Sequence, residues 1–132
     1  MKITRNASAP SMTGKVPENF TGVVRVDNMA TPNPPGRASA ALVTFAPGAR
    51  TVWHTHPAGQ TIIVTAGKGW VQREGDARVD INPGDTVYFD AGERHWHGAT
   101  ATTGMSHIAI TESVDGTNVD WLEPVTETEY AS

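Results

Sequence analysis

The sequence predicts an all-β fold, a jelly-roll barrel of two sheets that ends in a short C-terminal helix. Short segments rich in valine, isoleucine, threonine and aromatic residues follow one another along the chain at regular spacing. Glycine (13 residues) and proline (9 residues) are spread between these segments instead of forming a linker. Many short strands separated by turns are typical of a sandwich or a barrel, and a double-sheet jelly roll is the arrangement that we expect.

Turn residues bound each expected strand. Examples are Pro47-Gly48, Gly67-Lys68-Gly69, Gly75-Asp76 and Pro83-Gly84. Between such turns, β-branched and aromatic side chains favour extended backbone because they pack well on a pleated surface. In chain order, the expected strands cover residues 21–28, 38–45, 51–56, 60–67, 69–75, 77–81, 85–90, 95–101 and 105–110.

The N-terminal segment and one internal loop have compositions unsuited to a core. Residues 1–19 are polar and are expected to form an N-terminal arm, and the proline-rich residues 29–38 are expected to form a loop. Near the C-terminus, Thr126 precedes Glu129 by three positions, which is the spacing of a capping box. We therefore predict a short terminal helix over residues 125–132.

The chain of 132 residues has the size of one domain. We expect a single domain over residues 1–132, with a barrel core over residues 38–112. The net charge of −4 and the scattered basic residues argue against a nucleic-acid partner, because such binding needs lysine and arginine to neutralise phosphates. An exposed sheet edge and the N-terminal arm favour a homodimer or a homotetramer, and a monomer is the alternative.

The sequence contains no cysteine, which excludes a disulfide framework and a thiolate metal site. The N-terminus lacks the apolar stretch of a signal peptide, and no apolar run approaches the roughly 18 residues of a membrane helix. We expect a cytoplasmic protein with a small-molecule substrate and no membrane partner. Any metal must then be held by nitrogen or oxygen atoms.

The histidines of this sequence are few and clustered. The five histidines are at positions 54, 56, 95, 97 and 107, and four of them form two His-x-His pairs. Because side chains alternate in a strand, both members of a pair point to the same face, about 6.5 to 7 Å apart along the backbone. Gln60 opens the next expected strand. Two neighbouring strands can therefore place His54, His56, Gln60 and one histidine of the second pair around a single ion.

Three imidazoles and an amide oxygen suit a divalent metal of the manganese, iron, cobalt, nickel or zinc type. A single histidine in a strand is more often a hydrogen-bonded core residue than a ligand, and this alternative applies to each histidine taken alone. Two His-x-His pairs in one small β-protein favour the metal site.

Two segments resemble the sequence motifs of the cupins. The first segment reads Gly48-x5-His54-x-His56-x3-Gln60-x6-Gly67. The second segment reads Gly84-x5-Asp90-x-Gly92-x2-His95. The resemblance implies the cupin fold, a double-stranded β-helix, and it implies that His95 is the ligand from the second histidine pair.

Three positions depart from the usual cupin pattern. Gln60 stands where most cupins have glutamate, Asp90 stands where proline is usual, and Ala99 replaces a frequent asparagine. The glutamine leaves the site without an anionic protein ligand, so a bound ion keeps its full double charge. Such an ion polarises a bound oxygen more strongly, which favours Lewis-acid chemistry over oxygen activation. The alternative is that Gln60 only loosens the site.

Two histidines remain beyond those that the metal set needs. His97 follows His95 on the same strand face, and His107 shares a face with Ala109 and Thr111. A plain structural role is the alternative for His107. Near a dication the protonated forms of both imidazoles are disfavoured, so both are expected to be neutral near pH 7 and able to accept protons. A Lewis acid beside two neutral bases can move protons around a bound hydroxyl or carbonyl group.

The resemblance is more specific over residues 50–75, 92–99 and 119–130, which look like the small bacterial cupins that act as R-selective hydroxynitrile lyases. It implies reversible cleavage of an R-cyanohydrin such as mandelonitrile into an aldehyde and hydrogen cyanide, with manganese as the usual metal. It also implies metal ligation by His54, His56, Gln60 and His95 and catalysis by His97 and His107.

The substrate pocket is expected to be lined by small side chains. Ala41 and Val43 share a face of the strand over residues 38–45, and we expect them and Thr111 to line the pocket; ordinary barrel core is the alternative. Alternative functions are a dioxygenase or decarboxylase acting on another small substrate, or a cupin that binds a small ligand without turnover. The spare histidines argue against a simple binder, and Gln60 argues weakly against the dioxygenase.

Overall fold

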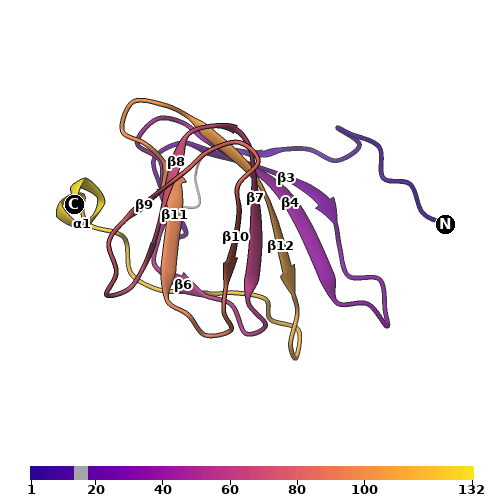
Figure 1. Cartoon of the computed structure of the whole chain (residues 1–132). Coiled ribbons are helices and arrows are strands. Elements are labelled where there is room, and N and C mark those ends of the chain that lie inside the picture. The colour runs from indigo at the N-terminus through magenta and orange to yellow at the C-terminus, as the bar shows by residue number, and fades with distance from the viewer. Residues whose placement is uncertain (14–17) are drawn as a thin grey trace.

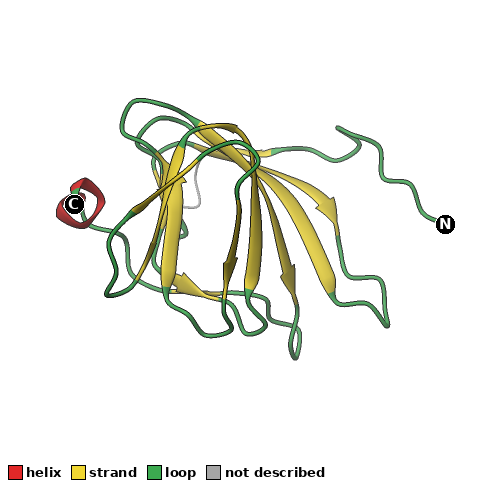
Figure 2. Cartoon of the chain, viewed as in Figure 1, coloured by secondary structure: helices red, strands yellow, loops and turns green. Residues whose placement is uncertain are grey.

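The computed structural model describes residues 1–13 and 18–132, so the arm expected over residues 1–19 lies partly outside the described residues. Two curled antiparallel sheets face each other, the N-terminus lies on the side of the molecule that carries residues 24–30, and the short helix α1 (Glu127–Ala131) lies outside the barrel on the opposite side (Figure 1). Strands and loops make up nearly the whole chain (Figure 2), which confirms the all-β prediction.

The first sheet has six strands in the order β1-β3-β4-β12-β7-β10. They are β1 (Met12–Thr13), β3 (Val24–Ala30), β4 (Ala38–Phe45), β7 (Gln60–Gly67), β10 (Thr86–Phe89) and β12 (Met105–Glu112). In this sheet β12 lies between β4 and β7, so spatial neighbours come from distant parts of the chain. This interleaving is the mark of a jelly roll.

The second sheet has seven strands in the order β13-β6-β11-β5-β2, with β8 paired to β11 and β9 paired to β8. They are β2 (Phe20–Thr21), β5 (Arg50–Thr51), β6 (His54–Thr55), β8 (Gly69–Arg73), β9 (Val79–Ile81), β11 (His95–Ala99) and β13 (Asp120–Trp121). Strand β11 pairs with β5, β6 and β8, which places the second histidine pair at the centre of this sheet.

The main core lies between the two sheets. Its buried apolar residues are Val24, Val43, Phe45, Ala49, Ile62, Val64, Val71, Ile81, Phe89, Ala99 and Met105. In β12, Met105 and His107 are buried on the inner face, whereas Ile108 and Ile110 on the outer face are only half-buried. Alternation along the strands therefore directs the polar site residues into the barrel together with the apolar core.

The predicted C-terminal helix is present as α1 (Glu127–Ala131). Thr126 is its N-cap, and the side chains of Thr126 and Glu129 each bond the main chain of the other, which completes the capping box. Among the described residues, no helix is long and apolar enough to cross a membrane.

A second apolar cluster joins the C-terminal segment to the outer face of the second sheet. Its buried members are Trp53, Trp96, Val125 and Tyr130. The Tyr130 hydroxyl donates a hydrogen bond of 2.8 Å to the Ala99 carbonyl. Trp96 lies between His95 and His97 in β11, so its side chain points to the opposite side of the sheet, and Trp53 packs in the same cluster. The C-terminal segment thus covers the back of the strand that carries His95 and His97.

The strand expected over residues 51–56 is interrupted. β5 ends at Thr51 and β6 begins at His54, because the main-chain N–H groups of Val52 and Trp53 bond the carbonyls of Asn19 and Glu123 instead of a neighbouring strand. His56 follows β6 and is not part of a strand. The regular alternation that the sequence predicted for the first histidine pair is therefore replaced by an irregular segment that distant parts of the chain hold.

Candidate metal centre and active site

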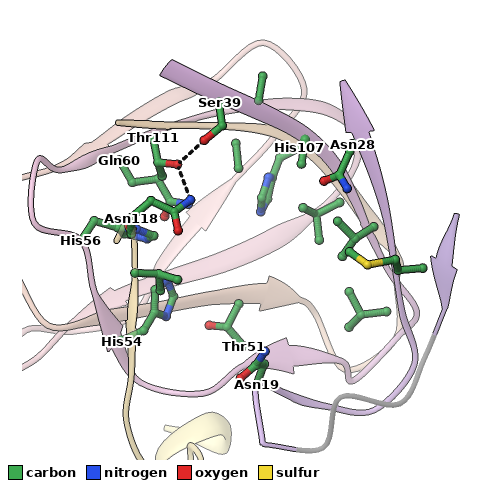
Figure 3. Close-up of a pocket in the computed structure, with 18 of the residues that line it drawn as sticks. Asn19, Asn28, Ser39, Thr51, His54, His56, Gln60, His107, Thr111 and Asn118 are labelled. Atoms are coloured by element: carbon green, nitrogen blue, oxygen red, sulfur yellow. Dashed lines mark hydrogen bonds between the residues drawn. The ribbon is translucent and has the colours of Figure 1, made fainter. Parts of the chain in front are cut away.

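Six polar side chains converge inside the barrel, each at most 5% exposed. They are His54, His56, Gln60, His95, His97 and His107. Strand pairing brings them together: His54 lies opposite His95 in the β6–β11 pair, and β12 places its inner residues beside β7. Figure 3 shows the labelled side chains of His54, His56, Gln60 and His107 around one cavity.

Main-chain carbonyls orient three of the imidazoles. Nδ1 of His54 and Nδ1 of His95 lie 2.9 and 2.8 Å from the carbonyl oxygen two residues earlier in the chain. Nδ1 of His56 lies 2.6 Å from the carbonyl oxygen of Asn118. A carbonyl oxygen only accepts hydrogen bonds, so Nδ1 carries the proton and the neutral ring keeps a lone pair on Nε2. Metal-ligating histidines are commonly held in this way.

The amide oxygen of Gln60 is a fourth atom that can bind a metal. Its Oε1 lies 3.2 Å from Nε2 of His95, the nitrogen that bears the lone pair. Nε2 of His56 is buried and has no hydrogen-bond partner among the described residues. Oε1 of Gln60 and Nε2 of His95 are both hydrogen-bond acceptors and face each other. A cation between them is favourable, because without it neither buried atom has a positively charged partner or a hydrogen-bond donor. The residues present therefore fit a divalent metal.

His97, which was predicted to lie outside the metal set, lies close to two of the expected ligands. Donor atoms of His54, His95 and His97 all lie within 4.8 Å of one another. His97 is nevertheless held differently from the other three imidazoles, because its Nδ1 faces a ring nitrogen and not a carbonyl. Its tautomer is therefore not fixed for metal binding. His56 differs in this respect, because the Asn118 carbonyl bonds its Nδ1 and its Nε2 has no partner among the described residues.

His97 and His107 form a buried hydrogen-bonded pair. Nε2 of His107 lies 2.9 Å from Nδ1 of His97, and their outer atoms, Nε2 of His97 and Nδ1 of His107, have no partner among the described residues. Between two neutral rings one facing nitrogen donates and the other accepts. Each ring has a single proton, so one outer nitrogen is then a base and the other is an N–H acid. The pair offers one of each in either tautomeric arrangement.

Burial lowers the pKa of every imidazole in the site below the usual value of 6.5. Lost hydration of the charged ring is the largest cause in each case. It lowers the pKa of His95 to about 4 and that of His107 to about 3. For His54 and His97, neighbouring imidazoles lower the pKa further by charge repulsion. All five rings are therefore neutral at pH 7 and present lone pairs.

These lowered pKa values predict that the metal-free protein loses stability in weak acid. Below pH 6.5 the histidines of the unfolded chain take up protons while the buried rings stay neutral, so the unfolded state binds more protons. Each such ring lowers the free energy of unfolding by about 1.4 kcal/mol per pH unit. The folded protein therefore has its full stability above pH 6.5, where the histidines are neutral in both states, and it loses stability as the pH falls towards 4.

Urea unfolding between pH 7.5 and 5 measures this slope. The variant His107→Gln has one fewer buried imidazole. Its free energy of unfolding should therefore depend less steeply on pH, by an amount that corresponds to about one proton fewer taken up on unfolding. Equal midpoints at pH 7.5 and 5 in the metal-free protein would contradict the prediction.

A cavity of about 380 Å³ is lined by five of the six polar side chains of the site, all except His95. The predicted pocket residues Ala41, Val43 and Thr111 all line it. Ala41 lies opposite Ala109 across the β4–β12 pair, and these two small side chains leave the space that larger residues would fill. The cavity is also lined by apolar residues that the sequence did not indicate, among them Phe20, Val24, Val26 and Trp121. The pocket can therefore hold a small molecule with an apolar side group beside the imidazoles.

The sequence did not indicate a role for Asn118. Its carbonyl orients His56, and its side chain bonds Thr111 at the pocket wall (Figure 3). The only signal was a turn dipeptide, Asp115-Gly116, a type of sequence that reverses the chain between paired segments. Nothing in this pattern shows where the returning segment lies.

The cupin domain family matches residues 41–111 of the chain, which include both histidine pairs and Gln60. The chain belongs to the cupin family. It is 56% identical to an (R)-mandelonitrile lyase from Granulicella tundricola over 98% of both chains. The resemblance to the small cupins that the sequence motifs indicated is therefore confirmed.

Solved structures agree with this assignment. A cupin-like protein from Thermotoga maritima superimposes with a TM-score of 0.84 and is 38% identical, covering 96% of this chain and 95% of that chain. A cupin-2 domain from Rhodospirillum rubrum superimposes with a TM-score of 0.74 over 98% of this chain and 84% of its own, at 17% identity. The second similarity concerns the fold alone.

Proposed function

We propose that this cupin is a metal-dependent hydroxynitrile lyase, which cleaves R-cyanohydrins of the mandelonitrile type into an aldehyde and hydrogen cyanide. The observation that carries this proposal is the 56% identity to an (R)-mandelonitrile lyase along nearly the whole chain. The buried group of imidazoles beside an apolar cavity supports the same chemistry.

Four residues would hold the metal: His54, His56, Gln60 and His95. Three of them present an unprotonated Nε2 and the fourth an amide oxygen, a donor set that suits manganese, iron, cobalt, nickel or zinc in the divalent state. When bound, such a cation supplies Lewis-acid stabilisation of the negative charge that develops on the substrate oxygen. We propose manganese, the usual metal of the small lyases that the sequence resembles.

His97 and His107 perform the proton transfers. The base of the pair accepts the cyanohydrin hydroxyl proton while the bond between the carbinol carbon and the nitrile carbon breaks, and the hydroxyl oxygen becomes the aldehyde oxygen. The departing cyanide takes a proton from the acid of the pair. The protonated cyanide then leaves as hydrogen cyanide. Because the 2.9 Å contact couples the two rings, a proton gained at one outer nitrogen replaces the one lost at the other.

The pocket wall supports a substrate with an apolar side group. Ala41, Val43 and Thr111 face the cavity from β4 and β12, on the same inner surface as His107. We propose that the phenyl ring of a mandelonitrile-type substrate lies against Ala41 and Val43.

Replacing Gln60 with glutamate tests the role of a neutral ligand. A carboxylate at this position lowers the net charge of the metal site, so Gln60→Glu is expected to slow cyanohydrin cleavage by about tenfold, or roughly 1.4 kcal/mol of transition-state stabilisation. Metal content should be retained. Gln72→Glu is a matched control, because Gln72 bonds Trp96 away from the cavity. A Gln60→Glu variant with the wild-type kcat would contradict the charge argument.

The proposed reaction is tested by measuring metal content and activity on one sample. Elemental analysis gives the metal, and benzaldehyde release from R-mandelonitrile is followed without oxygen, with and without added manganese. S-mandelonitrile is the control for stereoselectivity. Cleavage that needs metal but no oxygen is expected. A metal-loaded protein that fails to cleave R-mandelonitrile would overturn the proposed reaction, and oxygen uptake with other substrates would instead favour a dioxygenase.

We also propose that the chain forms a homodimer or a homotetramer. Leu42, Ile63 and Ile108 are neighbours across three strands on the outer face of the first sheet, where they are only half-buried. An apolar row of this kind supports sheet packing between copies. Light scattering on the wild type and on Ile108→Lys measures the oligomeric state. The cytoplasmic location stays a prediction.

A further inference from the structure

The three imidazoles proposed as ligands are oriented in two different ways. His54 and His95 each bond the carbonyl two residues earlier in the chain. His56 bonds the carbonyl of Asn118, which lies 62 positions away. The first two orientations are therefore fixed within their own segments. The orientation of His56 depends on where the segment after β12 lies.

A tight turn returns that segment to the site. Val114 and Thr117 bond each other through both main-chain groups, and the two residues between them have positive φ angles, 51° for Asp115 and 81° for Gly116. Two consecutive positive φ angles reverse the chain within two residues, which is the geometry of a type I′ turn. Asn118 follows the turn directly, and β13 begins two residues later beside β6.

Side-chain hydrogen bonds fix Asn118 to the barrel. Its Nδ2 donates to Oγ1 of Thr111 over 3.1 Å, and Oγ1 of Thr111 lies 3.2 Å from Oγ of Ser39 (Figure 3). Thr111 also lies opposite Gln60 in the β12–β7 pair. A chain of hydrogen bonds therefore runs from β4 through β12 to the segment that orients His56.

We propose that Asn118 and Thr111 are positioning residues for the metal site: their hydrogen bond holds the Asn118 carbonyl against Nδ1 of His56, which fixes the tautomer and the direction of that ring. This inference rests on the proposed metal site and deepens it. Outer partners of ligating histidines contribute about 10- to 100-fold to metal affinity. Asn118→Ala and Thr111→Val remove the bond and are expected to weaken metal binding by that factor.

Two measurements on the full chain test the inference. The dissociation constant for Co²⁺ is taken from a titration of the metal-free protein followed by visible absorption. The tautomer of His56 is taken from ring nitrogen chemical shifts of the metal-free protein, assigned by comparison with His56→Gln. We expect the wild-type ring to have its proton on Nδ1, and both variants to show a mixture of tautomers. Thr111→Ser keeps the hydroxyl and should restore both values.

Thr44→Val is the matched control. Oγ1 of Thr44 accepts a 3.2 Å bond from Oγ of Ser106 between the same two strands, β4 and β12, but outside the cavity. Its loss should leave the Co²⁺ affinity and the His56 tautomer unchanged. An Asn118→Ala variant with the wild-type His56 tautomer, or with Co²⁺ affinity within twofold of the wild type, would overturn the inference. Failure of the wild type to cleave mandelonitrile would overturn the proposed reaction only, because neither measurement depends on turnover.

Discussion

His54→Ala is expected to lose the metal and cyanohydrin cleavage together. His54 is 1% exposed, its Nδ1 is bonded to a main-chain carbonyl, and one of its ring nitrogens lies within 4.8 Å of a ring nitrogen of His95. Alanine removes one of three imidazoles from a site that has no anionic ligand to compensate. Elemental analysis should show little metal in the purified variant, and benzaldehyde release should be undetectable.

The matched control for this variant is His107→Ala, which removes an equally buried imidazole from outside the proposed ligand set. It should keep its metal. Thermal unfolding of both metal-free variants separates loss of the metal from loss of the fold, since each substitution leaves a cavity of similar size. A folded His54→Ala protein that retains stoichiometric metal and activity would show that His54 is not a ligand.

His97→Gln and His107→Gln are each expected to keep the metal and to lower kcat by about a hundredfold or more, the contribution of a general acid or base. The reaction needs one group to accept a proton and another to donate one. Either substitution leaves the remaining ring without the partner that sets its tautomer. Steady-state kinetics with R-mandelonitrile and metal analysis of the same samples check this expectation.

The double variant His97→Gln/His107→Gln distinguishes a coupled pair from two independent groups. If the 2.9 Å contact makes the rings act as one unit, the double variant should be little slower than either single variant. Independent groups would multiply their effects instead. Single variants that turn over at the wild-type rate would contradict the proposed acid–base roles altogether.

Local chemistry explains why much of the fold could be predicted from the sequence. The capping box of α1 depends on residues three positions apart, and the strands β4, β7, β11 and β12 depend on the side chains within each segment and on the turns beside them. The same holds for the orientation of His54 and His95, whose partners lie two residues away. The spacing of the histidine pairs predicted a metal site that includes His54, His56 and Gln60.

Tertiary structure decided the features whose partners are distant in the chain. The break between β5 and β6 exists because Asn19 and Glu123 bond the intervening main chain, and no pattern within residues 51–56 indicates this. The pairing of His97 with His107 depends on two strands in different sheets that face each other across the core. The sequence by itself determined which residue types can hold a metal and move a proton. Packing of the sheets and the path of the C-terminal segment decided how the rings of His56, His97 and His107 are oriented, because their hydrogen-bond partners are distant in the sequence and meet only in the folded chain.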